Sequence, residues 1–240
     1  MSVNKRADKS DIGAGDAVES TAHSDPGKFW RQENLRFAEP HYRLIKAARI
    51  IKKLAQGREC TLLDVGCGPA ALAHLLPRNI DYYGIDIAIQ DPAPNLLEAD
   101  LRTAPVKFGD KTFDIVLAQG IFEYVGDTQS QKFAEIAELL NRDGKFIVSY
   151  WNFGHRSPDM YHAFSNIQSF ADFRKDLSRH FKIDKFFPAS HNWRHTGPNR
   201  RITRAINMPM EINIPLVSPA LAVEYFFVCS PYQGNARDLS

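Results

Sequence analysis

Short apolar runs alternate with helical stretches between residues 60 and 150, and this alternation limits the fold more than any other feature. A run of this length suits a strand that is buried on both faces, whereas a buried helix needs about ten residues or more. Buried strands that alternate with helices form a parallel sheet covered by helices on both sides. The sequence therefore predicts an α/β fold. The expected strands are residues 61–65, 82–85, 96–97, 113–118 and 145–150.

The N-terminal segments differ in character from this core. Residues 1–27 contain almost no large apolar side chains, so we predict a disordered tail, followed by one domain over 28–240. Within 28–57 the apolar spacing predicts two helices, the second of which ends at Gly57. We expect these two helices to cap the active site.

The C-terminal part carries the remaining predicted elements. The predicted helices are residues 132–140, closed by a turn at 141–144, and residues 170–181, and the predicted strands are 183–187 and 222–229. The connection between those two strands is long for a hairpin, and long insertions tend to be functional. We interpret residues 191–221 as an inserted lid or acceptor segment.

Composition excludes several classes of protein. The net charge of only +2 gives no overall attraction to nucleic acid, which is not an expected partner. The three cysteines, an odd number without CxxC spacing, predict neither a disulfide framework nor a metal site, and reduced thiols favour a cytoplasmic location. No apolar run is long enough to span a bilayer, so we expect no membrane partner.

One segment has the features of a nucleotide-binding site. Residues 62–70 read Leu-Leu-Asp-Val-Gly-Cys-Gly-Pro-Ala, in which a buried strand delivers Asp64 and a glycine-rich turn follows. Such a turn lets the backbone approach a ligand closely before a helix starts. A second strand ends in Asp86, where an acid binds ribose hydroxyls in folds of this type.

Two cofactor classes fit this spacing. Gly66, Gly68 and Ala71 also satisfy the GxGxxA variant of a dinucleotide site, so a NAD-dependent oxidoreductase is one alternative. Asp64, however, favours a sulfonium or amino group just before the turn and would repel a pyrophosphate. Asp100, after the third strand, is positioned to accept a hydrogen bond from an adenine amino group.

These segments resemble the motifs of class I, S-adenosylmethionine-dependent methyltransferases over about residues 61–150. The matching motifs are Asp64-Val65-Gly66-Cys67-Gly68, Tyr83-Gly84-Ile85-Asp86, Ala99-Asp100-Leu101, residues 113–125 and residues 141–149. Residues 151–155 are similar to the MetW-like subgroup. The resemblance implies a three-layer α/β/α sandwich, with a mostly parallel, seven-stranded sheet whose last strand is antiparallel. It also implies S-adenosyl-L-methionine as cofactor and S-adenosyl-L-homocysteine as product.

The resemblance further implies a role for each cofactor residue. Asp64 and the backbone of Gly66 and Gly68 would hold the methionine end of the cofactor. Its ribose would lie on Asp86 and Ile87, its adenine on Asp100 and Leu101, and its remaining surface on Gln119 and Tyr124.

The chain departs from the family between Asp86 and Asp100. These residues are only 14 positions apart, where relatives fit a full helix. Pro92 and Pro94 disfavour α-helical geometry in the residues before them. We therefore expect a shortened crossover that leaves one face of the sheet thinly covered near the cofactor.

The predicted reaction is methyl transfer by direct SN2 displacement. The predicted acceptor is a small molecule with an oxygen or nitrogen nucleophile. His155, just beyond the fifth strand, is the preferred general base, ahead of His191 and His195. Tyr124 is a second catalytic candidate. A non-catalytic S-adenosylmethionine-binding module is a further alternative, because the family has no universal catalytic side chain.

The predicted acceptor segment combines positive charge with apolar surface. Residues 174–204 carry nine basic residues against two acidic ones, which favours an anionic acceptor. Residues 206–221 are apolar and nearly uncharged, which indicates either a wall for a partly hydrophobic acceptor or a homodimer contact. The candidate acceptor-binding residues are Trp151, His191, Arg194, Arg200 and Arg201.

Overall fold

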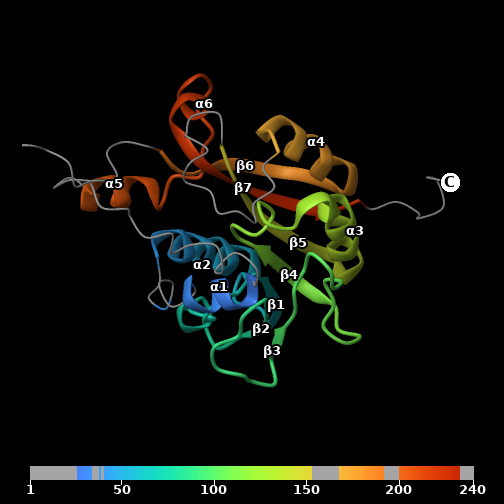
Figure 1. The fold of residues 1–240 in the computed structure, drawn as a ribbon. Helices are drawn as coiled ribbons and strands as arrows, with labels where there is room; N and C mark the ends of the chain where they lie inside the picture. The colour runs from blue at the N-terminus through green and yellow to red at the C-terminus, as the bar shows by residue number, and fades with distance from the viewer. Residues whose placement is uncertain (1–25, 34–37, 39–40, 153–167, 192–199, 233–240) are drawn as a thin grey trace, which may run out of the picture.

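A seven-stranded sheet in the order β3-β2-β1-β4-β5-β7-β6 forms the centre of the protein (Figure 1). The computed structural model describes residues 26–33, 38, 41–152, 168–191 and 200–232. The strands are β1 (Cys60–Val65), β2 (Ile80–Asp86), β3 (Leu96–Glu98), β4 (Phe113–Ala118), β5 (Leu140–Trp151), β6 (Phe181–His191) and β7 (Ala222–Pro231). β1 to β5 pair in parallel, and β7 runs antiparallel to both β5 and β6. The predicted sheet, with its antiparallel last strand, is confirmed.

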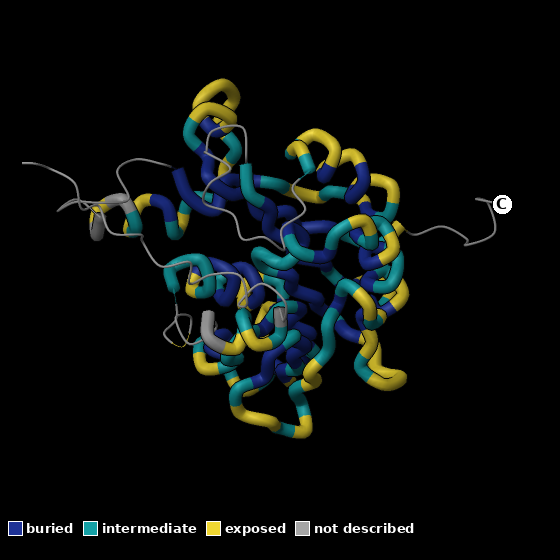
Figure 2. The backbone as a smooth tube through the Cα atoms, in the orientation of Figure 1, coloured by how far each residue is buried: buried dark blue, intermediate teal, exposed yellow. Residues whose placement is uncertain are grey.

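Helices cover both faces of this sheet and make the three predicted layers. α3 (Gln129–Leu139) and α4 (Phe170–His180) lie on one face, and α2 (Tyr42–Ala55) lies on the other (Figure 1). The buried residues form two clusters, one for each face. Figure 2 shows the buried backbone concentrated at the centre of the molecule. On the α3 side, the rings of Phe122 and Phe133 stack with centroids 4.4 Å apart.

The second predicted helix corresponds to α2. Its apolar stripe faces the sheet, with Ala47 and Ile51 fully buried, because residues four apart lie on one face of a helix. α2 ends at Ala55, where Gln56 and Gly57 both adopt positive φ angles. The helix therefore ends two residues before the predicted end at Gly57. α1 (Pro26–Glu33) precedes it, and the predicted tail falls almost entirely outside the described residues.

The helix expected after the glycine-rich turn is absent, and this prediction is wrong. Residues 66–79 form turns and a single 3-10 turn, η2 (Ala73–Leu75). Pro69 and Pro77 cannot donate helical hydrogen bonds, and Ala70 has a φ of 53°, outside the right-handed helical region. The connection is therefore too short and too interrupted for a covering helix.

Of two other predicted connections, the one between β2 and β3 is confirmed and the one before β5 is wrong. Residues 87–95 between β2 and β3 contain no helix, so the shortened crossover is confirmed. The turn at 141–144 is wrong, because β5 begins at Leu140 and these residues form an irregularity within the strand. Asn141 Nδ2 donates to Asp114 Oδ1 at 2.8 Å, which ties the irregular part of β5 to β4.

The connection between β6 and β7 contains α5 (Arg200–Asn207) and α6 (Val217–Leu221). Both helices contact β6, and α6 also contacts β7. Another short helix, η3 (Gly126–Thr128), leads into α3. No helix in the described part of the chain has the length and apolar character needed to cross a membrane.

Candidate functional site

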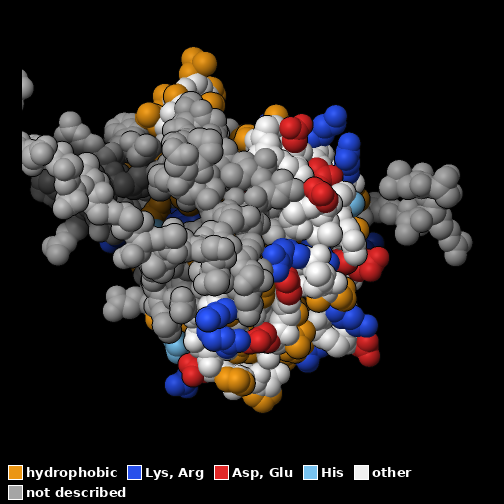
Figure 3. All heavy atoms as spheres, in the orientation of Figure 1, with side chains coloured by type: hydrophobic (Ala, Val, Ile, Leu, Met, Phe, Trp, Pro, Cys, Tyr) orange, Lys and Arg blue, Asp and Glu red, His pale blue; other side chains and the backbone are white. Residues whose placement is uncertain are grey.

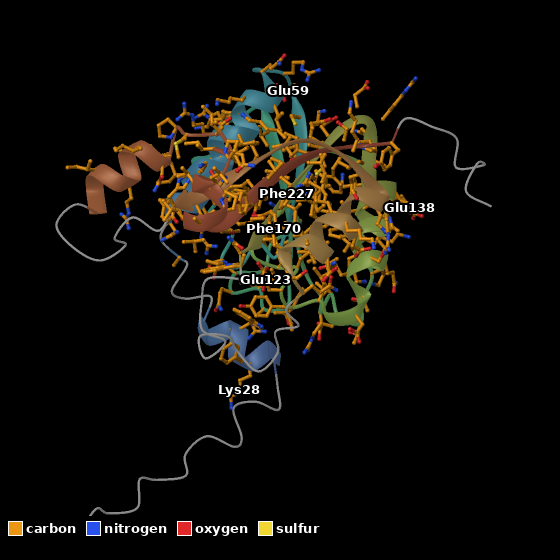
Figure 4. All side chains as sticks on the ribbon, turned by 90° about the horizontal axis from the view of Figure 1, so that it is seen from above. Lys28, Glu59, Glu123, Glu138, Phe170 and Phe227 are labelled. Carbon is orange, nitrogen blue, oxygen red and sulfur yellow. The ribbon has the colours of Figure 1, made fainter. Side chains whose placement is uncertain are left out.

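The carboxyl ends of the parallel strands bring the predicted cofactor residues to one edge of the sheet. Figure 4 shows Glu59, just before β1, at the opposite end of the molecule from Glu123, which follows β4 and lies on the side of α1. Ligands bind at the carboxyl edge in open α/β sheets. The site therefore lies at the Glu123 end.

Asp64 is the buried acid at the end of β1. Its side chain is 3% exposed, and its Oδ2 accepts a hydrogen bond from the Tyr82 hydroxyl at 2.9 Å. Burial raises the pKa of Asp64 to about 7, the nearby Asp86 adds to this, and the Tyr82 hydrogen bond opposes it. A cationic ligand at this position would restore the ionised form.

Asp86 holds the glycine-rich turn in place. Its Oδ2 accepts from the backbone N–H of Gly68 at 2.8 Å, and its Oδ1 accepts from that of Ala88 at 2.9 Å. Gly66 and Gly68 have φ angles of 78° and 53°, which favour glycine, so the turn depends on these residue types. Asp86 thus has a structural role that the sequence did not indicate, besides its predicted contact with ribose.

Asp100 forms a local ion pair. Its Oδ2 lies 2.6 Å from Arg102 Nη2, and its Oδ1 accepts from the Arg102 backbone and Nε. This pairing lowers the pKa of Asp100. Leu101 beside it is buried, whereas Ile87 is half-buried. The predicted adenine contact of Asp100 stays a prediction, and its carboxylate would have to accept from adenine in addition to Arg102.

Gln119 directly follows β4 and offers a polar group to a ligand. Its side-chain Oε1 and Nε2 are both closed off from solvent, and neither has a hydrogen-bond partner within the described ranges. A buried amide without partners costs free energy, so such a group usually has a ligand or water as its partner. The next residue, Gly120, donates its N–H to Ser149 Oγ at 2.9 Å.

Tyr124 lies farther along the same loop, beneath α1. Its ring meets that of Trp30 edge to face, with centroids 4.9 Å apart. α1 is also attached to the β2–β3 crossover, because Arg31 donates to the carbonyl of Ile89 at 2.9 Å and pairs with Glu98. The first predicted helix therefore covers the end of β4.

Sequence reasoning missed a group of three charged residues at this edge. Arg43 in α2 pairs with Glu224 in β7, with Nη1 and Oε2 3.0 Å apart, and Glu123 Oε1 accepts from the backbone N–H of Trp151 at 3.0 Å. Burial raises the pKa of Glu123 to about 8. The guanidinium of Arg43 lies 5.8 Å from the ring centre of Trp151, a predicted acceptor residue. The only sequence signals were the position of Glu123 shortly after one apolar strand and that of Glu224 inside another.

Of the other predicted acceptor residues, the structure describes the side chain of His191 only. His191 is buried at the end of β6, with Nδ1 and Nε2 each 3.3 Å from the side chains of Asn207 and Ser218, and burial lowers its pKa. His155, Arg194 and His195 lie outside the described residues, as do the side chains of Arg200 and Arg201.

The residues at this edge fit S-adenosylmethionine. Its ammonium and sulfonium groups are positively charged, which suits a site with two neighbouring, buried carboxyl groups, Asp64 and Asp86. The unpaired amide of Gln119 offers both a donor and an acceptor to a polar ligand.

Comparison with known proteins agrees with this fit. The profile of a family described as "Methyltransferase domain" matches residues 63–148, which include the end of β1, the glycine-rich turn, and β2, β3 and β4. A search of curated proteins found no match.

Solved structures with the same fold include several methyltransferases. A TehB-like enzyme described as S-adenosylmethionine-dependent, from Corynebacterium glutamicum, is 15% identical, with a TM-score of 0.53 over 85% of this chain and 95% of that one. An S-adenosylmethionine-dependent methyltransferase from Clostridium acetobutylicum is 12% identical, with a TM-score of 0.57 over 85% and 98% of the two chains. The 1,6-didemethyltoxoflavin-N1-methyltransferase of Burkholderia thailandensis, with bound S-adenosylhomocysteine, is 16% identical, with a TM-score of 0.55 over 83% of each chain. At these identities the likeness concerns the fold.

Proposed function

Because the chain is a class I, S-adenosylmethionine-dependent methyltransferase, we propose that it transfers the methyl group to a small-molecule acceptor with an oxygen or nitrogen nucleophile. The observation that carries the proposal is that the polar groups near the predicted acceptor residues are buried. Glu123, Glu224 and His191 are each at most 3% exposed. A small molecule can enter such an enclosed site more readily than a folded macromolecule.

When bound, S-adenosylmethionine supplies a methyl group that its sulfonium sulfur has already activated. The protein then has to align the nucleophile with the methyl carbon and exclude water. In this proposal Asp64 binds the methionine ammonium, Asp86 the ribose hydroxyls and Gln119 a polar group of the cofactor. Tyr124 and α1 exclude water from the end of β4.

We further propose that the acceptor is partly hydrophobic or anionic. Ile212 and Leu216 are 64% and 90% exposed, and Figure 3 shows hydrophobic side chains gathered around α6. In this interpretation residues 206–221 act as a lid, and a homodimer contact is the other use of the same surface. The basic residues of the 191–221 segment, Arg194, Arg200 and Arg201, would bind an anionic part of the acceptor. The neighbour from Burkholderia is by its description an N-methyltransferase of a small molecule, which supports this acceptor class.

Isothermal titration with S-adenosylmethionine, S-adenosylhomocysteine and NAD tests the cofactor assignment, with an Asp86→Ala variant beside the wild type. We expect both adenosyl ligands to bind and the variant to weaken them by about ten- to hundred-fold, because charge-assisted hydrogen bonds contribute about 1.5–3 kcal/mol each. NAD binding alone would favour the oxidoreductase alternative. Binding of the adenosyl ligands without turnover of any acceptor would favour the non-catalytic module.

The acceptor residues have their own tests. His155→Ala should lower turnover if His155 is the general base, and wild-type turnover in this variant would exclude that role. An unchanged acceptor KM in the Arg200→Ala plus Arg201→Ala variant would argue against an anionic acceptor. We also propose that the enzyme acts in the cytoplasm, in accordance with its three free, buried thiols, Cys60, Cys67 and Cys229.

A further inference from the structure

Glu123, Glu224, Arg43 and Trp151 come together although they belong to four different segments. Trp151 at the end of β5 lies directly opposite Glu224 in the antiparallel pairing of β5 with β7. The backbone N–H of Trp151 donates to Glu123 Oε1, and the guanidinium of Arg43 bridges from α2 to Glu224 Oε2 and to the Trp151 ring. The two glutamates are 2% and 1% exposed.

Each glutamate keeps one oxygen without a partner. Glu123 Oε2 and Glu224 Oε1 are closed off from solvent and have no hydrogen-bond partner in the part of the chain that the structure describes. Two carboxyl groups also face a single guanidinium, which leaves one negative charge in excess when both are ionised. Burial and the charge of Glu224 raise the pKa of Glu123, while Trp151 and Arg43 oppose this. Buried carboxylate oxygens without donors are costly, so this arrangement is poorly explained by stability alone.

The group borders the cofactor-binding turn. A Cβ at Gly66 would lie 3.1–3.3 Å from the side chain of Ile121, so the turn packs directly against the loop that holds Glu123. A Cβ at Gly120 would lie 4.0 Å from Arg43 Nη1. One short loop, residues 119–123, therefore joins the unpaired amide of Gln119, on the cofactor side, to the unpaired oxygen of Glu123.

The unpaired atoms define the ligand that would satisfy them. Burial keeps a proton on Glu123 in the ligand-free protein at neutral pH, and a cation bound beside it would favour its ionised form. Two ionised carboxylates only accept hydrogen bonds, so their two free oxygens then require two N–H or O–H donors. A hydroxyl supplies one donor and no charge, whereas a primary ammonium supplies three donors and the missing positive charge. We propose that Glu123 and Glu224 bind the amino group of the methyl acceptor, which makes the enzyme an N-methyltransferase of a small primary amine. This inference rests on the methyltransferase function proposed above.

The same carboxylates provide the proton acceptor that such a reaction needs. Transfer of one proton from R–NH3⁺ to the Glu123 carboxylate leaves a neutral amine with a free lone pair. That lone pair would form the new bond from nitrogen to the methyl carbon of S-adenosylmethionine. The bond from this carbon to the sulfonium sulfur would break at the same time, and its electron pair would stay on sulfur. The products are an N-methylammonium and a neutral thioether, with Glu123 protonated. Glu123 thus touches the reacting nitrogen, and Glu224 orients it from β7.

Access to the pair requires that a covering element moves, because both oxygens are closed off from solvent. α1 lies over this edge, attached through the Trp30–Tyr124 ring contact and through Arg31, whose ion pair with Glu98 is about half exposed. Exposed ion pairs contribute little free energy, so α1 can separate from the edge at low cost.

The proposal can be tested by calorimetric titration of the S-adenosylhomocysteine-loaded protein. The three probes share a phenyl ring and differ in charge and in their hydrogen-bonding group. The probes are benzylammonium, benzyl alcohol and benzoate, and the proteins are the wild type, Glu123→Gln, Glu224→Gln and Glu59→Gln. Glu59 is exposed at the opposite end of the molecule and provides the matched control (Figure 4). Binding of S-adenosylhomocysteine by each variant reports that it is folded.

We expect the wild type and Glu59→Gln to bind benzylammonium at least about ten-fold more tightly than benzyl alcohol, and the other two variants to lose this preference. Glu123→Gln leaves the Arg43–Glu224 pair intact, so its result stands even if Glu224→Gln fails to fold. Equal binding of the three probes, no binding of benzylammonium, or a preference that survives Glu123→Gln would overturn the proposal. Failure of the wild type to bind S-adenosylhomocysteine would instead overturn the methyltransferase function on which it depends.

Discussion

Replacement of Lys46 by methionine should destabilise the protein far more than an ordinary lysine substitution. Lys46 lies in α2 and its side chain is fully buried. Its three N–H groups donate to four backbone carbonyl oxygens, so one N–H is shared between two of them. The distances are 2.9 Å to Pro188, 3.2 Å to Ala189, 3.0 Å to Asn207 and 2.8 Å to Met210. One side chain thus joins α2 to the end of β6 and to the segment after α5.

The magnitude follows from what Lys46→Met removes and what it leaves. Methionine keeps most of the apolar volume but has no donor, so four carbonyl oxygens lose a partner, at about 1–3 kcal/mol for each one that stays buried and unpaired. The variant no longer buries a charge, which offsets several kcal/mol of this loss. Backbone carbonyls cannot be replaced together with the lysine, so the compensation is incomplete. We expect a net loss of about 3–5 kcal/mol in the free energy of unfolding.

Urea unfolding followed by circular dichroism measures this loss, with Lys52→Met as the control. Lys52 is exposed on the same helix, and its replacement should change the free energy of unfolding by no more than about 0.5 kcal/mol. Hydrogen exchange should also show lower protection of residues 207–216 in Lys46→Met, because the tether to this segment is lost. A loss below about 1 kcal/mol with unchanged protection would refute the reasoning, since it would mean that the carbonyls find other partners at no cost.

Three further predictions concern the cofactor edge. The ligand-free protein should lose stability as the pH rises from about 4 to 7, by up to about 4 kcal/mol, because folding raises the pKa of Asp64 to about 7 and the folded state therefore keeps a proton that the unfolded state releases. Glu123, whose pKa folding raises to about 8, adds to the loss in the same direction. Asp64→Asn should therefore reduce the slope of the urea-derived stability profile without removing it, and an identical slope in both proteins would contradict the assignment. Gly84→Ala should cost about 1–3 kcal/mol in urea unfolding, because its Cβ would lie 2.7 Å from Cys67 Sγ. Adding Cys67→Ala should recover part of that loss, and no recovery would exclude this contact as the cause. Arg31→Ala should change the free energy of unfolding by less than about 1 kcal/mol, since its ion pair with Glu98 is about half exposed, and a larger loss would show that α1 is held more firmly than its contacts indicate.

Local patterns were sufficient for most of the sheet. Residues 113–118 were predicted as a strand and form β4 with the same bounds, because a short apolar run bounded by polar residues has few other stable states. The end of β1 at Val65 could be predicted for the same reason, and β2 ends at Asp86, one residue beyond the predicted run 82–85. The helix expected after Gly68 failed because the general pattern of such folds was applied where Pro69 and Pro77 prevent it.

The sequence by itself determined where most strands lie along the chain, the acids near their ends and the class of cofactor, because these depend on residues that are neighbours along the chain. Only the tertiary structure decided which distant groups meet. Arg43 and Glu224 are 181 residues apart, and Lys46 binds carbonyls that carry no side-chain signal at all. Hydrogen bonds and ion pairs depend on separations of a few ångströms and on orientation. Residues far apart in the chain acquire such geometry only when the packing of α2, β6 and β7 on the sheet has set their positions.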